Sequence, residues 1–261
     1  VLKPHDPDSE QFFSLLGVYL AFVANWSLIH AANLSIYWSL ATEEQFYIVW
    51  PLIEKVCRPR TILMVLFTFI VINQCINFGY FDSFFTYLYG GDTEGASLEI
   101  LEATFTPICF GVLLAHTLNN KVWFARMYTV LSHKWASGII LFTLLLVVFL
   151  SPKDISGFPR LLIQWMMCLW LASLVVREGH VLEGIMCFFP IKRLGQISYG
   201  MYVYHMFALH IVRELLQHYG IALSYYYFIL GFFITIFIAE MSFRLYESPI
   251  LSLSKKYRTT G

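Results

Sequence analysis

Apolar residues occur in a series of runs along the chain, separated by short polar stretches. The runs cover about residues 12–29, 38–53, 61–80, 100–118, 135–151, 158–176, 194–216 and 226–247. Most of them are close to the ~20 residues that a helix needs to cross a bilayer. We therefore expect an all-α, polytopic bundle of transmembrane helices with about seven or eight membrane segments, which forms a single domain over residues 1–261.

The second run is the least suited to a simple crossing. Its apolar part is short, and we expect Pro51 to kink or end the helix. A short helix of this kind is typical of a re-entrant segment, which is tolerated at membrane depth where it is buried in protein or lines a cavity.

Basic residues between the runs predict an orientation. They occur in every second connection and in the C-terminal tail: Lys55, Arg58, Arg60, Lys121, Arg126, Lys134, Arg177, Lys192, Arg193, Lys255, Lys256 and Arg258. Connections with this bias face the cytoplasm. The pattern indicates an integral, multi-pass membrane protein with a cytoplasmic C-terminus.

The composition agrees with a membrane protein and narrows the function. The chain is 58% hydrophobic and 13% charged, and its formal net charge is zero. It has no basic tract that would suit a nucleic acid partner. Its five cysteines are scattered without a Cys-x-x-Cys pair, so we interpret them as free thiols and expect no metal site.

The most informative stretch is residues 38–51, WSLATEEQFYIVWP. In a helix, Ser39, Glu43, Tyr47 and Trp50 share one face. An ionisable side chain in a membrane segment is costly to bury, so Glu43 is a functional candidate. The alternative is that Glu43 and its neighbour Glu44 lie in the first helical turn and favour the positive end of the helix dipole.

A second polar group opens the run at 194–216. Ser198, Tyr202 and His205 are spaced i, i+4 and i+7, so they share a helix face. They indicate either a polar cavity or hydrogen bonds between neighbouring helices.

A third polar group lies on the last run. Glu240, Arg244 and Glu247 have the same spacing. We expect them to form a structural ion network, because pairing lowers the cost of each charge in lipid.

These three regions resemble motifs of the membrane acyltransferase-3 family. WSLATEEQFY resembles its Trp-Ser-Leu-x-x-Glu-x-x-Phe-Tyr signature, and residues 194–205 resemble its Leu-Gly-x-Ile-Ser-Tyr-x-x-Tyr-x-x-His element. Residues 244–249 resemble its closing Arg-Φ-x-Glu-x-Pro element, where Φ is apolar. The resemblance implies O-acylation of a glycan or lipid-linked acceptor by acyl-CoA, which we take to be acetyl-CoA, from the cytoplasmic side.

Acyl transfer to a hydroxyl needs a base, oxyanion donors and a site that excludes water. A carboxylate in a low dielectric has a raised pKa, so Glu43 is the expected catalytic base. The expected substrate-binding residues are Trp38, Ser39, Tyr47, Ser198, Tyr199 and His205. Basic side chains are candidates to contact the phosphates of coenzyme A: Arg58, Arg60, Lys192 and Arg193.

The resemblance also implies a catalytic histidine and a partnering arginine on the family's first span. No histidine of this sequence occupies that motif. We therefore expect that the chain lacks the first spans of its family and is inactive alone.

Two other function classes remain open. A membrane transporter of a small polar solute also uses buried acids and re-entrant segments, although the chain shows no repeated half. A receptor-like helical bundle fits the number of spans, but it leaves the adjacent acids and the ordered motifs unexplained.

Overall fold

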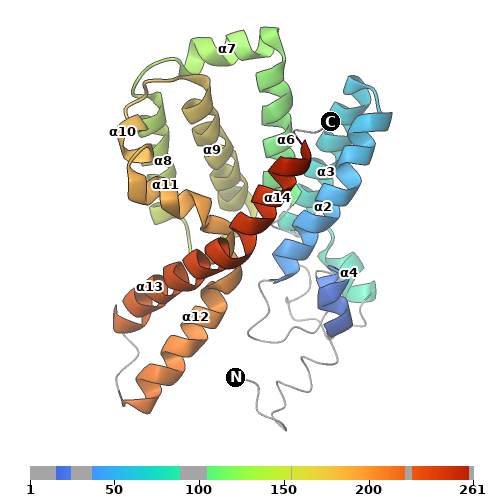
Figure 1. The fold of residues 1–261 in the computed structure, drawn as a ribbon. Helices are drawn as coiled ribbons and strands as arrows, with labels where there is room; N and C mark the ends of the chain where they lie inside the picture. Colours follow the sequence, from blue (N-terminus) through green and yellow to red (C-terminus); the bar gives the residue numbers. More distant parts are fainter. Residues whose placement is uncertain (1–15, 25–36, 89–104, 154, 221–224, 259–261) are drawn as a thin grey trace. The chain divides into compact units, whose positions relative to one another are not determined.

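The computed structural model describes residues 16–24, 37–88, 105–153, 155–220 and 225–258, and every regular element within these ranges is helical (Figure 1). The predicted all-α class is thus confirmed for this part of the chain. Contacts divide the chain into two compact units, which we describe separately. One comprises Val1–His30 and Tyr37–Gly184, and the other comprises Ala31–Ile36 and Ile185–Gly261.

The helices follow the apolar runs closely. The first unit contains α2 (Tyr37–Val56), α3 (Pro59–Asn77), α4 (Asp82–Leu88), α6 (Phe105–Asn119), α7 (Lys121–Leu131), α8 (Ala136–Leu150) and α9 (Gly157–Val176). The second unit contains α11 (Phe189–Gln196), α12 (Ser198–His218), α13 (Tyr225–Ser242), the π-turn η3 (Phe243–Glu247) and α14 (Ser248–Arg258). The short helix α10 (Glu183–Met186) lies at the boundary in sequence.

The described residues include fewer simple crossings than the sequence predicts. Three stretches are long and apolar enough to span a membrane: α3, α9 and the stretch Tyr225–Leu253. They are four if α7 and α8, which are bent by 77° at a short break, form one span. The predicted seven or eight are not confirmed. Within the described residues α6 and α8 have 15 residues each, and polar side chains lower the mean hydropathy of α2 and α12. Half of the predicted run at 12–29, namely residues 12–15 and 25–29, lies outside the described residues.

Pro51 does not end α2, so this half of the expectation is wrong, whereas a kink at Pro51 stays a prediction. The helix continues for five residues to Val56. Proline removes one backbone hydrogen bond, but packing around it holds the helix. The ring of Trp50 stacks on Phe46 with centroids 5.1 Å apart, and Ile53 packs against the same core.

Two apolar clusters hold the first unit together on either side of α6. The first cluster joins α2, α3 and α6 through Trp50, Ile62, Leu66 and Cys109. The second joins α6, α7 and α9 through Leu114, Leu131, Ala172 and Val176. Because α6 contributes to both, it is the central helix of this unit.

The basic connections of the first unit gather at one end. Arg177, which follows α9, donates a hydrogen bond to the carbonyl of Ser132, which follows α7. Near the ends of α2 and α6, Nε2 of His116 lies 2.8 Å from Oε1 of Glu54. The connections that follow α2, α6, α7 and α9 therefore lie together, as expected if they share one side of a membrane. That this side is cytoplasmic stays a prediction.

Buried amides that were not predicted from the sequence join α3, α6 and α9 near the other end. Oδ1 of Asn73 accepts from the hydroxyl and the backbone amide of Thr106 (2.6 and 3.2 Å), and Nε2 of Gln74 donates to the same hydroxyl (2.8 Å). Asn77 donates to the carbonyl of Gly157 (2.9 Å) and accepts from its amide (3.1 Å). The sequence does contain a signal for these contacts, because three amide side chains, Asn73, Gln74 and Asn77, occur close together in an apolar run.

Replacing Asn77 with Leu should destabilise the protein, because it leaves both backbone groups of Gly157 without their partner. A fully buried polar group without a partner costs about 1–3 kcal/mol, and the partly buried groups of Gly157 should cost less. We expect a clearly lower thermal unfolding temperature for the purified protein in detergent. The matched control is Asn119→Leu, an exposed amide, which should unfold at nearly the wild-type temperature. Equal unfolding temperatures for the two variants would contradict the proposed role of Asn77 in joining α3 to α9.

Candidate functional site

One turn near the start of α2, residues 39–42, is buried on every side. Ser39, Leu40, Ala41 and Thr42 are at most 8% exposed. Successive helical residues point about 100° apart, so four consecutive buried residues leave no face of this turn open. Glu43 follows directly and is half-buried. The predicted signature helix thus carries its carboxylate at the edge of an enclosed segment.

Burial, and secondarily the carboxylate of Glu44, raises the pKa of Glu43 above its ordinary value of 4.5. The helix α2 is not among those that are long and apolar enough to span a membrane.

The first turn of α2 contains no acidic residue, because the helix begins at Tyr37. The helix-dipole alternative is therefore wrong, since that effect falls off within the first turn.

The rest of the predicted stripe is unevenly covered. Ser39 and Trp50 are both 8% exposed, whereas Tyr47, which lies between them on the same face, is 57% exposed. The enclosed part of the stripe is thus its N-terminal end, where Ser39 and Glu43 lie one turn apart. The side chain of Trp38 lies outside the part that the structure describes.

The second motif divides between two helices. Ile197 lies between α11 and α12 and has a non-helical backbone, with φ −100° and ψ 6°. The helix α12 therefore begins at Ser198 and not at residue 194. The hydroxyl of Ser198 donates to the carbonyl of Gly195 at 2.9 Å. Tyr199 is 54% exposed. Ser198 therefore stabilises this helix–helix corner.

His205 has a defined tautomer. Its Nδ1 lies 2.6 Å from the carbonyl oxygen of Tyr202, and a carbonyl can only accept, so Nδ1 carries the proton. Nε2 is then the basic nitrogen of the neutral ring. The alternative of hydrogen bonds between helices is realised elsewhere on α12, where Tyr204 accepts from Ser242 of α13 at 3.2 Å.

Close contact between α12 and α13 depends on Gly200, which lies in the second motif. A Cβ added there would lie 3.3 Å from Cβ and 3.4 Å from Cα of Ala239. We expect Gly200→Val to lower the unfolding temperature, because its branched side chain must push a backbone away at a cost of about 1–3 kcal/mol. Gly195→Val is the control within the same motif, since a Cβ there meets nothing within 4 Å. A harmless Gly200→Val would contradict this packing role.

Glu240 is the centre of the predicted ion network. Its carboxylate accepts from Arg244 at 2.6 Å, which confirms the expected i, i+4 pair. It also accepts two hydrogen bonds from Arg193 of α11, from Nε to Oε2 at 2.9 Å and from Nη2 to Oε1 at 2.8 Å. This pairing was not predicted from the sequence, from which Arg193 was expected to contact phosphate. Because two of its nitrogens bind Glu240 and a third binds Gln196 at 2.9 Å, we now assign Arg193 a structural role.

Glu247 does not join the network as expected. Pro249 cannot donate to the carbonyl of Leu245, and its ring would clash with that carbonyl in a regular α-helix. The wider π-turn over Phe243–Glu247 accommodates the proline and shifts the register by one residue. Among the described residues, the ion pairs of Glu240 lead to Arg193 and Arg244, and none includes Glu247.

A second candidate site, also missed from sequence, lies between α2 and α6. The indole of Trp50 donates to Oε1 of Glu54 at 3.0 Å, and the same oxygen lies 2.8 Å from Nε2 of His116. These side chains border a cavity of about 660 Å³ that Lys55 and Asn119 also line. The i, i+4 spacing of Trp50 and Glu54 was visible in the sequence, but the partner on α6 was not. In the described residues, no group of three or more His, Cys, Asp or Glu could hold a metal.

The comparisons with known proteins agree with the motifs. The family model described as an acyltransferase domain, that of the acyltransferase-3 family, matches residues 3–240. The provisionally named peptidoglycan O-acetyltransferase YrhL of Bacillus subtilis (strain 168) is 25% identical over 229 residues, which are 82% of this chain and 34% of YrhL. The O-acetyltransferase OatA of Staphylococcus aureus (strain NCTC 8325 / PS 47) is 26% identical over 222 residues, 82% of this chain and 35% of OatA.

The chain therefore spans about a third of the length of each of these relatives. No solved structure is significantly similar to it. The family match covers most of the chain and includes the first two motifs, with Glu43 and His205. On this match, the chain belongs to the acyltransferase-3 family.

Proposed function

We propose that the full-length protein is an integral membrane O-acyltransferase, which moves an acyl group from acyl-CoA to a hydroxyl of a carbohydrate acceptor. The observation that carries the proposal is the environment of Glu43. This carboxylate belongs to the family signature, and it lies half-buried directly after the buried turn of residues 39–42. Its raised pKa brings it closer to the neutral range in which a general base works best.

In this proposal Glu43 takes the proton of the acceptor hydroxyl while the hydroxyl oxygen attacks the thioester carbon. A C–O bond forms, the C–S bond breaks, and the proton passes to the departing thiolate of coenzyme A. Ser39 lies one helical turn from Glu43 on the same face, where it would orient the acceptor. The more exposed Tyr47 would bind the acceptor further along that face.

The remaining predicted contacts keep their proposed roles. Trp38, Tyr199 and Ser198 are proposed to bind substrate, and His205 to accept a hydrogen bond at Nε2. Arg58 lies in the connection between α2 and α3, Arg60 lies in the first turn of α3, and Lys192 lies on α11. These three cations are proposed to contact the phosphates of coenzyme A from the cytoplasmic side.

The names of the relatives support the choice of donor and acceptor. YrhL and OatA are both named for O-acetyl transfer, and the name of YrhL specifies peptidoglycan. We therefore propose acetyl-CoA as the donor and a cell-wall carbohydrate as the acceptor.

The test is an assay of the full-length protein in liposomes, with acetyl-labelled acetyl-CoA outside and peptidoglycan fragments as acceptor. We expect the label to appear in alkali-labile esters on the sugar. A lack of transfer to any hydroxyl acceptor, together with flux of a polar solute in the absence of acetyl-CoA, would replace the proposal with the transporter alternative.

A further inference from the structure

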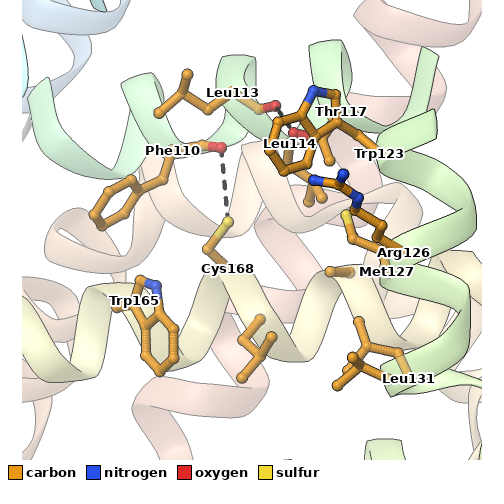
Figure 2. A pocket seen from close by; sticks show the side chains of 13 residues that line it. Phe110, Leu113, Leu114, Thr117, Trp123, Arg126, Met127, Leu131, Trp165 and Cys168 are labelled. Atoms are coloured by element: carbon orange, nitrogen blue, oxygen red, sulfur yellow. Dashed lines mark hydrogen bonds between the residues drawn. The ribbon is translucent and has the colours of Figure 1, made fainter. Parts of the chain in front are cut away.

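An apolar cavity of about 500 Å³ lies in the first unit between α6, α7 and α9 (Figure 2). Its walls are mainly hydrocarbon and aromatic, with Phe110 on α6, Met127 on α7 and Trp165 on α9. Two small side chains of α9, Cys168 and Ala172, leave the space between these larger groups. The cavity is long enough along α9 to run over about two helical turns, from residue 165 to residue 172.

One end of the cavity is cationic. Among the described residues that line it, Arg126 is the one charged side chain, and none is a carboxylate. The guanidinium carbon of Arg126 lies 4.9 Å from the centre of the Trp123 ring, a stacked position that holds the charge in place. Figure 2 shows Arg126, Trp123 and Thr117 at one end of the cavity, and Phe110 and Trp165 toward the other.

The bend between α7 and α8 supports a position of this cationic end at a membrane surface. The helix is bent by 77° from α8, and α8 packs against the candidate span α9. A helix at nearly a right angle to spanning helices lies close to the membrane plane, where tryptophan and arginine contact the head groups. The basic connections of the first unit gather at this same end, which is predicted to face the cytoplasmic leaflet with its anionic lipids.

We propose that this cavity binds one acyl chain of an anionic phospholipid of that leaflet, with the lipid phosphate paired to Arg126. Charge complementarity selects this occupant. A single guanidinium matches the single negative charge of a phosphatidylglycerol head group. Acyl-CoA carries several phosphate charges, whereas Arg126 is the one charged side chain among the described residues that line the cavity. The inference requires that the chain spans a membrane, and it does not depend on the proposed acyl transfer.

The test measures lipid retention by the purified full-length protein with native mass spectrometry. The probes are phosphatidylglycerol and phosphatidylcholine with identical palmitoyl and oleoyl chains. Wild-type protein should prefer phosphatidylglycerol by roughly five-fold, because one basic residue near the head groups contributes about that factor. Arg126→Gln should remove the preference and Arg126→Lys should retain it. Arg126 is exposed, so neither change threatens the fold.

Lys121→Gln is the matched control for charge. Lys121 is also an exposed cation of α7, but it does not line the cavity, so its loss should leave the preference intact. Cys168→Leu is the control for volume. It partly fills the cavity from a half-buried position and should weaken retention of both lipids while the preference stays.

Three results would overturn the proposal. Equal losses in Lys121→Gln and Arg126→Gln would show that only the general surface charge of α7 attracts the lipid. Equal retention of the two lipids by the wild-type protein would show that no head group is selected. Displacement of phosphatidylglycerol by palmitoyl-CoA at a lower concentration than by free phosphatidylglycerol would assign the cavity to an acyl-CoA.

Discussion

Replacing Glu43 with Gln is expected to abolish acyl transfer in the full-length protein while leaving it folded. The amide has nearly the same shape but cannot take a proton, so the loss should reach the ~10²–10⁴-fold that general base catalysis contributes. The position is half-buried, and the neutral side chain is easier to bury than the carboxylate. The measurement is the rate of acetyl transfer from labelled acetyl-CoA, with the unfolding temperature recorded on the same sample.

Glu44→Gln is the matched control for this variant. Glu44 is also a half-buried side chain of α2, but it points about 100° away from Glu43. We expect it to retain most of the activity. Transfer by Glu43→Gln at a rate close to that of Glu44→Gln would remove Glu43 from its proposed role.

The same pair of residues predicts a shift in pH dependence. The basic form of Glu43 is the deprotonated one, so the transfer rate should fall as the pH drops through its pKa, which lies above 4.5. Glu44 is the second cause of that rise, after burial. In Glu44→Gln the acidic limb of the pH–rate profile should therefore move to lower pH. An unchanged limb would indicate that another group controls it.

Local periodicity predicted the parts of the fold that depend on one stretch of chain. The helices α3, α8 and α9 begin and end within three residues of the predicted runs. The face shared by Ser39 and Glu43 and the Glu240–Arg244 pair follow from helical spacing alone. These features were accessible because the interacting residues are at most four positions apart.

Contacts between distant segments were not accessible in this way. Asn77 binds Gly157 across 80 positions, and Arg193 binds Glu240 across 47. Hydropathy locates each helix but does not identify its neighbour, so Arg193 was assigned to a ligand instead of to a helix partner. The position of Glu247 was also not predicted. The expected spacing assumed a regular α-helix, and the π-turn before Pro249 moves Glu247 away from the face of Glu240 and Arg244.

Glu240→Ala is expected to be the most destabilising charge substitution in the second unit. It removes the hydrogen bonds to Arg193 and Arg244 together and leaves two cations beside one another. The carboxylate and the Arg193 side chain are only 22% and 27% exposed, so water replaces the lost partner incompletely. The guanidinium of Arg193 also lies 4.5 Å from the centre of the Phe243 ring, which keeps it in this position.

The partners of Glu240 should rank in a defined order. Arg193→Ala should lower the unfolding temperature less than Glu240→Ala, because Glu240 then keeps Arg244. Arg244→Ala should lower it least of the three, because that side chain is 70% exposed and pairs only within its own helical stretch. Glu247→Ala, on the adjoining turn, is the control and should be close to wild type. Scanning fluorimetry of the full-length protein gives all four temperatures. A Glu247→Ala variant as unstable as Glu240→Ala would show that the π-turn, and not the Arg193–Glu240 bridge between α11 and α13, is what holds this unit.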